Sequence, residues 1–339
     1  MKFFVGDYTR LGGPGVGLCE LEGHTLRLLE TAPELADPTY VILSADQKTL
    51  YATSSSPADG EDFGSVAAYD ISDGHLRYVS QQSTSGLSAC HLTLSADERF
   101  LYVANYVTGS IAVFPVSGAQ ISPHIQLIEH EGHGPNPARQ ERAHAHFVAF
   151  DPEDNQLLYA VDLGIDAVMI YRQDPETGLL TAHQRVDVPA GLGPRHLIFH
   201  GADMMYVAHE LGGAVSAFRR SSMGWTLMQT LPTLPDDWQG ENTVAAIRIH
   251  ASRLFVSNRG HDSLAVYKIA SSGELALEGI YSTLGRTPRD FIILPDGRLL
   301  VSHQDSGDIR LFELGASGLA QIGETLPFAG AVCLCPVAE

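Results

Sequence analysis

The chain has 339 residues, of which 44% are hydrophobic, so it can form one large domain with a sizeable core or two small ones. Its 40 acidic residues outnumber its 21 Lys and Arg residues, which gives a formal net charge of −19 at pH 7. Such a surface repels nucleic acid phosphates and anionic membranes, which we therefore do not expect as partners, and an anionic substrate would need a local pocket of Arg and His.

One pattern of apolar and polar residues recurs along the whole chain. In the copy LYVANYVTGSIAVFPV (101–116), an apolar pair leads through Val or Ala to a polar pair, a Gly-containing turn and alternating apolar residues. The starts of successive copies are 45 to 57 residues apart, a spacing typical of repeat architectures. In chain order the copies begin at Phe3, Leu50, Leu101, Leu158, Met205, Leu254 and Leu299.

Further strand-like segments flank these copies. A short apolar run that ends in a turn precedes most of them, as in HLTLSAD and FIILPDG, and alternating residues follow, as in TGLLTAHQRV. Each repeat therefore offers about four short strands and no convincing helix. Seven repeats of this kind predict an all-β fold, a seven-bladed β-propeller with four antiparallel strands per blade. We call these strands A to D, from the central channel outward.

The two ends of the chain fit this fold. The first copy begins at Phe3, so the strand that should precede it is missing. The segment AGAVCLCP near the C-terminus has the pattern of that strand, and we expect it to pair into the N-terminal blade and close the ring. No linker-like change in composition divides the chain, which predicts a single propeller domain over residues 1–339.

No targeting or membrane segment is expected. Asp7 interrupts the apolar run of MKFFVGDYTR, so we predict no signal peptide. The least polar stretch, LPFAGAVCLCPVA, is too short to span a bilayer, and four cysteines are too few for a disulfide framework. These features predict a cytoplasmic protein and leave its oligomeric state open.

Alignment of the repeats brings polar residues to one face of the ring. Strands A and B run antiparallel, so the start of A and the end of B should both lie at the mouth of the channel. The position at the start of A holds Thr39, Cys90, His146, Arg195, Ala245, Arg289 and Gly330. The polar pairs at the end of B are Asp7-Tyr8, Ser54-Ser55, Asn105-Tyr106, Asp162-Leu163, His209-Glu210, Asn258-Arg259 and His303-Gln304.

The charged members of these two rings suggest a binding site. A ring that only filled space would be apolar or Ser/Thr, whereas three arginines with a histidine and a glutamate need anionic partners. Each residue alone also has a structural interpretation. An arginine there is typical of a loop clamp, a histidine of a hydrogen-bonded structural residue, and Asp162 and Asn258 of caps on the turns between strands B and C.

Metal and cofactor sites are not predicted. His144 and His146 have an i, i+2 spacing that would offer two metal ligands from one strand, but the spacing assures no third ligand. The glycines of LGGPGVG (11–17) lack the helix and the later acidic residue of a dinucleotide-binding motif.

Six segments between residues 134 and 302 carry a resemblance to a known family. They are GPNPARQERAHAHFVAFDP, YAVDLGIDAVMIYR, GLGPRHLIFH, YVAHELGGAVSAF, NTVAAIRIHASRLFVSNRGHDSLAVYKI and TPRDFIILPDGRLLVS. Together they resemble the seven-bladed propeller lactonases, which include bacterial 6-phosphogluconolactonases and fungal carboxy-muconate cyclases. One departure is Arg248, which stands where the family has a more neutral residue.

The resemblance implies a set of site residues. The family's proposed active site carries over to His146 (second His of HAH), Arg195 (GPRH), Glu210 (HEL, where the family commonly has NEL) and Arg259 (SNRGHDS). We expect these four to be catalytic. The residues expected to bind substrate are Arg289, His144, Asp162 and Asn258.

Three functions remain open from the sequence. The leading hypothesis is a metal-independent lactonase for an anionic sugar lactone, most of all 6-phosphogluconolactone, which needs a base and oxyanion donors. His146 or Glu210 would be the base, and Arg195 and Arg259 would stabilise the oxyanion or bind anionic groups. The alternatives are a carboxy-muconate cyclase that closes a lactone, and a non-catalytic propeller that acts as a scaffold or ligand sensor.

Overall fold

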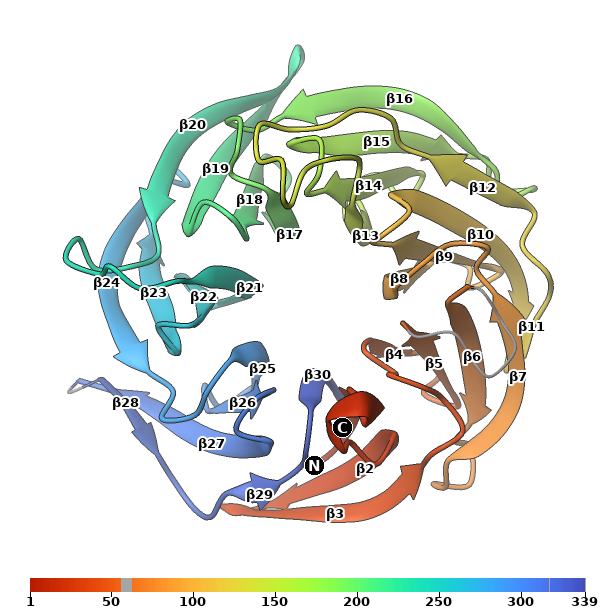
Figure 1. Cartoon of the computed structure of the whole chain (residues 1–339), viewed down its shortest axis with the longest axis horizontal. Helices are drawn as coiled ribbons and strands as arrows, with labels where there is room; N and C mark the ends of the chain where they lie inside the picture. Colours follow the sequence, from red (N-terminus) through yellow and green to blue (C-terminus); the bar gives the residue numbers. More distant parts are fainter. Residues whose placement is uncertain (56–62, 317, 339) are drawn as a thin grey trace.

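Seven antiparallel sheets lie side by side around a central channel in the computed structural model, which describes residues 1–55, 63–316 and 318–338 (Figure 1). The predicted seven-bladed β-propeller is therefore confirmed. In the described part of the chain the helical structure is a single turn, the 3-10 helix η1 (Thr9–Leu11) between the first two strands.

The strands of each blade follow one another from the channel outward. Blade 1 comprises β30 (Ala331–Pro336), β1 (Lys2–Asp7), β2 (Val16–Glu22) and β3 (Thr25–Ala32). Blade 2 comprises β4 (Val41–Leu43), β5 (Thr49–Ser54), β6 (Ser65–Asp70) and β7 (Arg77–Ser83). Blade 3 comprises β8 (Ala89–Leu94), β9 (Phe100–Asn105) and β10 (Ser110–Ser117), with β11 (Gln120–Ile121) and β12 (Gln126–Glu129) both paired to β10.

The remaining blades have the same plan. Blade 4 comprises β13 (Ala145–Phe150), β14 (Leu157–Asp162), β15 (Ala167–Gln173) and β16 (Leu180–Asp187). Blade 5 comprises β17 (Pro194–His200), β18 (Met204–His209), β19 (Ala214–Ser221) and β20 (Gly224–Pro232). Blade 6 comprises β21 (Thr243–His250), β22 (Arg253–Arg259), β23 (Ser263–Ile269) and β24 (Leu275–Ser282). Blade 7 comprises β25 (Pro288–Ile293), β26 (Leu299–His303) and β27 (Asp308–Gly315), with β28 (Gly318–Gln321) and β29 (Leu326–Pro327) both paired to β27.

The ring closes where the two ends of the chain meet. Strand β30 pairs antiparallel with β1, so that Phe3 lies opposite Pro336 and Val5 opposite Leu334. The C-terminal segment is thus the innermost strand of the N-terminal blade, as the repeat pattern predicts. The pairing removes the open sheet edges that a linear array of blades would leave.

The hydrophobic core lies between neighbouring blades rather than at the centre of the ring. One cluster, for example, packs Tyr102 and Val113 of blade 3 against Val148, Leu158 and Leu180 of blade 4. Because both faces of a blade are covered in this way, its B and C strands are buried on both sides. This burial explains why the sequence shows near-continuous apolar runs such as LYVA in place of a strict alternation.

The recurring tyrosine in these runs joins one blade to the next. The hydroxyl of Tyr51 donates to the carbonyl of Gly118 (2.7 Å), that of Tyr102 to Gly178 (2.9 Å) and that of Tyr206 to Gly273 (2.8 Å). Each acceptor lies between strands C and D of the following blade. The tyrosine ring thus fills the interface while its hydroxyl pairs a backbone carbonyl.

Tyr102→Phe should therefore destabilise the fold without disturbing the site. The ring remains in place, but the buried carbonyl of Gly178 loses its donor, so we expect the free energy of unfolding to fall by about 1 kcal/mol. Chemical denaturation with unchanged dependence on denaturant concentration would measure this loss. A variant as stable as the wild type would show that the hydrogen bond makes no net contribution.

Strand A carries a β-bulge at equivalent positions of several blades. The register with strand B shifts between Ala89 and His91, Ala145 and Phe147, Pro194 and His196, and Pro288 and Asp290. The extra residue of a bulge is unpaired and its side chain is re-aimed. The skipped residues are Cys90, His146, Arg195 and Arg289.

Candidate active site

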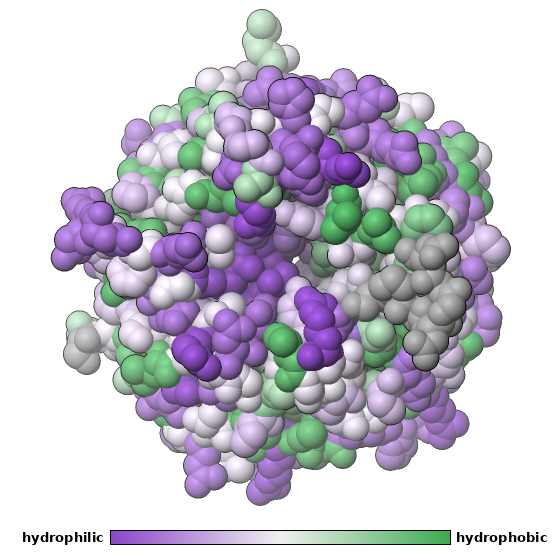
Figure 2. All heavy atoms as spheres, in the orientation of Figure 1, coloured by the Kyte–Doolittle hydropathy of each residue, from purple (hydrophilic) through white to green (hydrophobic). Residues whose placement is uncertain are grey.

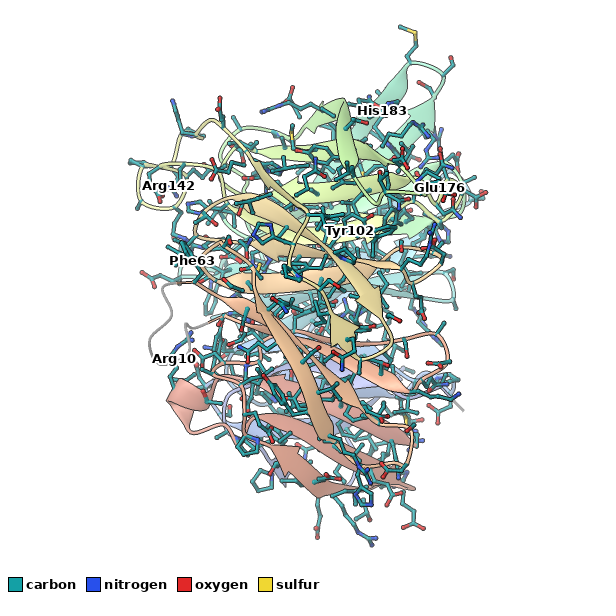
Figure 3. All side chains as sticks on the ribbon, turned by 90° about the vertical axis from the view of Figure 1, so that its right-hand side faces the viewer. Arg10, Phe63, Tyr102, Arg142, Glu176 and His183 are labelled. Atoms are coloured by element: carbon teal, nitrogen blue, oxygen red, sulfur yellow. The ribbon has the colours of Figure 1, made fainter. Side chains whose placement is uncertain are left out.

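The face that carries the starts of strands A and the ends of strands B, which we call the channel mouth, contains a cavity of about 550 Å³. Figure 2 looks onto this face and shows hydrophilic side chains gathered around its central hollow. In the side view, Arg10 and Arg142 lie on this face, whereas Glu176 lies toward the other (Figure 3). Among the described residues the cavity is lined by Tyr8, Arg10, Thr39, Ser55, Ser88, Cys90, Tyr106, Arg139, His146, Glu210, Thr243, Arg259 and Arg289.

Glu210 is the one carboxylate among these described lining residues, and three arginines surround it. Arg139 Nη2 donates to its Oε1 (2.5 Å), Arg259 Nη2 donates to its Oε2 (2.7 Å), and Arg195 Nε lies 3.1 Å from Oε2. Glu210 is only 4% exposed, and burial opposes its ionisation. The attraction of the arginines outweighs burial and holds the pKa of Glu210 well below its usual range, so the side chain is an anion at neutral pH.

Arg195 is buried next to Glu210, outside the set of lining residues, and extends from the bulge of β17. Its Nη1 donates to the carbonyl of Ala245 (2.8 Å) and lies 3.1 Å from His196 Nε2. Burial, together with repulsion from Arg259 and Arg289, lowers the pKa of Arg195 to about 9. The guanidinium is still protonated at neutral pH, but its charge lowers the stability of the folded protein.

His146 is the histidine of the cavity lining, and it is 5% exposed. Its ring makes edge contacts with Tyr106 and His196, each at 5.4 Å between centroids, and its Nδ1 has no hydrogen-bond partner among the described residues. Burial and the charges of Arg195 and Arg289 lower the pKa of His146 well below 6.5, although Glu210 opposes this. The imidazole is therefore neutral and can accept a proton.

Arg289 also lines the cavity and lies at the bulge of β25. It donates to Gln304 Oε1 (3.2 Å) and stacks over the ring of Tyr8 at 5.3 Å from the centroid. No described carboxylate forms an ion pair with it. Arg289 is thus a cation that faces the cavity without a counter-ion from the described protein.

Asp162, which the sequence predicts to bind substrate, has hydrogen-bond partners within the protein. Asp162 Oδ1 accepts hydrogen bonds from the backbone nitrogens of His144, Gly164 and Ile165, and its Oδ2 lies 2.7 Å from His130 Nδ1. These contacts support the turn-cap interpretation of Asp162.

Asn258 and His144 are held in a similar way. Asn258 accepts from the Thr233 hydroxyl (2.7 Å) and donates to the Thr233 carbonyl (2.8 Å). The ring of His144 stacks on Tyr106 at 4.6 Å, and its nitrogens lie 3.0 Å from the Tyr106 carbonyl and 3.2 Å from Glu141 Oε2. Neither residue is in the cavity lining, and a direct contact of either one with substrate stays a prediction.

Arg139 is a site residue that the repeat alignment missed. It lies in the loop between β12 and β13, where the backbone of Gly134 and Gln140 and the Gln140 side chain hold the turn. Arg139 bridges the Glu210 carboxylate and the Tyr106 hydroxyl (3.2 Å). One indication of Arg139 was present in the sequence, because it belongs to the segment that leads into His144 and His146. The repeat alignment could not find it, because a loop residue has no equivalent in the other repeats.

Arg248, the departure from the family pattern, has a partner inside the channel. Its Nη2 donates to Asp290 Oδ1 (2.7 Å), and Asp290 Oδ2 accepts from the backbone nitrogen of Leu334 (2.9 Å). Arg248 therefore neutralises a buried carboxylate of the neighbouring blade. The two residues form an ion pair in which each charge compensates the other.

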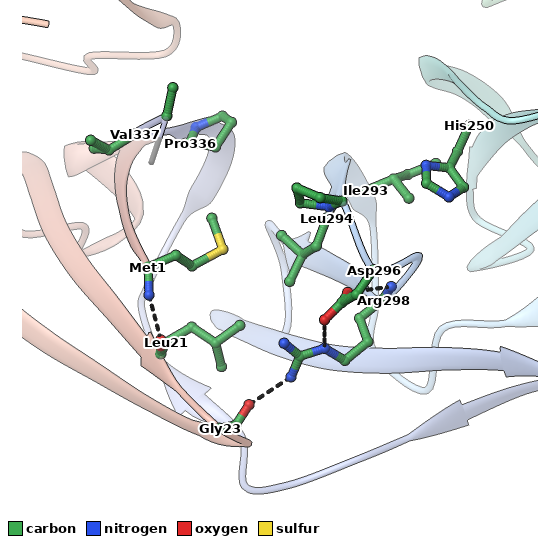
Figure 4. Close-up of a pocket in the computed structure, with 12 residues that line it drawn as sticks. Met1, Leu21, Gly23, His250, Ile293, Leu294, Asp296, Arg298, Pro336 and Val337 are labelled. Carbon is green, nitrogen blue, oxygen red and sulfur yellow. Dashed lines mark hydrogen bonds and ion pairs between the residues drawn. The ribbon is translucent and has the colours of Figure 1, made fainter.

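A larger cavity of about 820 Å³ is lined by residues at the ends of strands A, such as His250, Ile293 and Pro336, and therefore lies at the face opposite the channel mouth. Figure 4 draws its lining residues. Most of its lining is apolar, including Met1, Leu21 and Ile293. Its charged residues neutralise each other, since Arg298 Nε donates to Asp296 Oδ2 (2.7 Å). Because this cavity offers few groups for chemistry, the smaller and strongly charged one is the better candidate for an active site.

Metal-ligand clusters and membrane-spanning helices are both absent from the described residues. No group of three or more His, Cys, Asp or Glu side chains is placed to hold a metal ion in the described part of the chain. Within residues 1–55, 63–316 and 318–338, no helix is long and apolar enough to cross a membrane.

Comparison with known proteins adds independent information. The model of the family described as "Lactonase, 7-bladed beta-propeller" matches residues 2–336. The 6-phosphogluconolactonase of Bacillus subtilis is 37% identical over 323 residues, which cover 91% of this chain and 90% of that one. The periplasmic gluconolactonase of Pseudomonas aeruginosa has a similar structure, with a TM-score of 0.89, 30% identity and 98% coverage of both chains. A Lactobacillus plantarum protein superposes with a TM-score of 0.90 at 27% identity, again over 98% of each chain.

Proposed function

Because the chain belongs to the family of seven-bladed β-propeller lactonases, we propose that it is a lactonase that hydrolyses an anionic sugar lactone, with 6-phosphogluconolactone as the first candidate substrate. The observation that carries this proposal is the cavity at the channel mouth, where arginines surround one ionised carboxylate beside a neutral histidine. The names of the Bacillus and Pseudomonas relatives support lactone hydrolysis.

His146 is the better candidate for the general base. Arginines engage both carboxylate oxygens of Glu210, whereas His146 Nδ1 has no hydrogen-bond partner among the described residues. The imidazole of His146 is neutral and lines the same cavity. In our mechanism a water oxygen bonds to the lactone carbonyl carbon while His146 takes a proton from that water.

The arginines act on the negative charge that follows. As the water attacks, the carbonyl electron pair moves onto oxygen, and Arg259 and Arg195 stabilise this oxyanion. When the tetrahedral intermediate collapses, the bond to the ring oxygen breaks, and the imidazolium of His146 returns its proton to that oxygen. The product is the open-chain hydroxy acid, which is ionised at neutral pH.

Glu210 has a different role in this mechanism. Its carboxylate holds Arg139, Arg195 and Arg259, which come from a loop and two blades, in one cluster. Without that anion the three cations would repel one another. Glu210 thus positions the arginines, and each retains other N–H groups for the substrate.

The proposed activity has a direct test. Purified protein should hydrolyse 6-phosphogluconolactone faster than the spontaneous reaction, measured as 6-phosphogluconate formed after subtraction of the uncatalysed rate. Carboxy-muconate should be tested in parallel, since lactone formation could use the same groups. Activity on carboxy-muconate alone would replace our proposal with a cyclase, and activity on neither substrate would favour a non-catalytic propeller.

A further inference from the structure

The side of the cavity nearest blades 1 and 7 contains an aromatic ring between two arginines. The guanidinium carbon of Arg10 lies 3.8 Å from the centroid of the Tyr8 ring, and that of Arg289 lies 5.3 Å from the same centroid. All three side chains line the cavity. The Tyr8 hydroxyl has no hydrogen-bond partner among the described residues, so it is available to a ligand.

The local structure holds this trio in place. Tyr8 follows β1, and its backbone nitrogen donates to the carbonyl of Gly330 (3.0 Å), the residue just before the closing strand β30. Arg10 lies in η1, where its backbone nitrogen and its guanidinium both bind the Asp37 carboxylate. One edge of the Arg10 guanidinium is thereby anchored, while the side chain remains 55% exposed toward the mouth.

The charge around the cavity is positive although the protein is strongly acidic. Four arginines line the cavity, Arg10, Arg139, Arg259 and Arg289, and Glu210 is the one carboxylate among the described lining residues. Asp37, outside this lining, pairs with Arg10. Asp7 lies close by, but burial raises its pKa to about 8, so it is largely protonated at neutral pH. A net positive pocket in a chain of net charge −19 is suited to an anion of more than one charge.

We infer that Arg10, Tyr8 and Arg289 form a phosphate subsite, which selects lactones that carry a terminal phosphate over unphosphorylated lactones. The inference rests on the proposed lactonase function and assigns the non-reacting end of its substrate. Arginine forks pair with phosphate oxygens, and the Tyr8 ring holds both guanidinium groups within 5.3 Å of one point. The reacting carbonyl then lies toward His146 and Arg259, at the other part of the cavity.

The test compares 6-phosphogluconolactone with unphosphorylated gluconolactone in the same enzyme preparations. The wild type should have the higher kcat/KM for the phosphorylated substrate. Arg10→Gln should lower the ratio of the two kcat/KM values by about 10- to 100-fold, the value of one charge-assisted contact, mainly through KM. Arg289→Gln should change the ratio in the same direction.

Matched variants separate recognition from folding. Arg77→Gln is the control, because Arg77 is 65% exposed on β7 and pairs with Asp73 outside the cavity lining. It should leave the ratio at the wild-type value. Tyr8→Phe keeps the ring and should retain most of the preference, whereas Tyr8→Leu removes the platform and should lose it. Thermal melting of each variant checks that a lost preference does not arise from unfolding.

The outcomes distinguish this inference from the function on which it rests. If the protein hydrolyses neither lactone, the proposed function itself fails. If it hydrolyses both and Arg10→Gln and Arg289→Gln leave the ratio unchanged, the lactonase proposal stands and the phosphate subsite is overturned. The preference should also weaken as salt is added, since screening reduces attraction between exposed charges.

Discussion

His146→Gln should lower kcat for lactone hydrolysis by about 100- to 10,000-fold, the usual contribution of a general base. Glutamine fills a similar space and can form hydrogen bonds, but it cannot accept a proton from water. The residual rate should reflect the arginines alone. The measurement is steady-state hydrolysis with the spontaneous rate subtracted, together with thermal melting to show that the variant is folded.

The pH dependence of kcat/KM identifies the base. His146 acts when neutral, and burial, Arg195 and Arg289 lower its pKa, so the acid limb of the wild type should lie below pH 6.5. Arg289→Gln removes a positive charge and should move the limb to higher pH. Glu210→Gln removes a negative charge and should move it to lower pH. Unphosphorylated gluconolactone should be used as well, because a phosphate group itself titrates near pH 6.

A different pattern would identify Glu210 as the base. In that case Glu210→Gln would abolish the acid limb, while His146→Gln would keep it together with near-normal activity. A limb that is present in both variants would exclude both residues. The two substitutions therefore decide the question between them.

Arg195→Met should lower kcat by about 100- to 1,000-fold, as expected for the loss of an oxyanion donor. The same substitution should leave the Tm at or above the wild-type value at pH 7. The pKa of Arg195 is lowered to about 9, so folding disfavours its charge, and this cost is fully present below pH 9. Above that pH the cost declines, because the folded protein can release the proton.

This combination distinguishes a functional arginine from a structural one. Loss of one partner from an ordinary buried ion pair typically costs about 3–5 kcal/mol. Here Glu210 retains Arg139 and Arg259 after Arg195 is removed. A fall in Tm of many degrees would show that Arg195 mainly stabilises the fold, and unchanged kcat would remove it from the mechanism. Arg195→Lys, which keeps the charge but not the fork, should lose less activity than Arg195→Met.

The sequence was sufficient for the architecture because each blade repeats the same burial pattern. Copies such as those at Leu101 and Leu158 encode strands covered on both faces, and the recurring tyrosine encodes the junction with the next blade. The closing strand 331–336 could be recognised by the same pattern. The alignment also brought His146, Arg195 and Arg289 to one position, and in the structure each lies at the bulge of strand A in its own blade.

Only the tertiary structure decided which polar side chains reach the cavity. Asp162 and Asn258 occupy equivalent positions at the ends of B strands. Their side-chain oxygens accept hydrogen bonds from backbone nitrogens and from the Thr233 hydroxyl within the protein. Arg10 and Arg139 belong to segments without periodicity, and Arg139 meets a carboxylate 71 residues away in the chain. Strand patterns repeat because burial acts on every blade alike, so they can be read from the sequence. The partner of a charged loop side chain depends on where the closed ring places distant segments, and no local pattern records that.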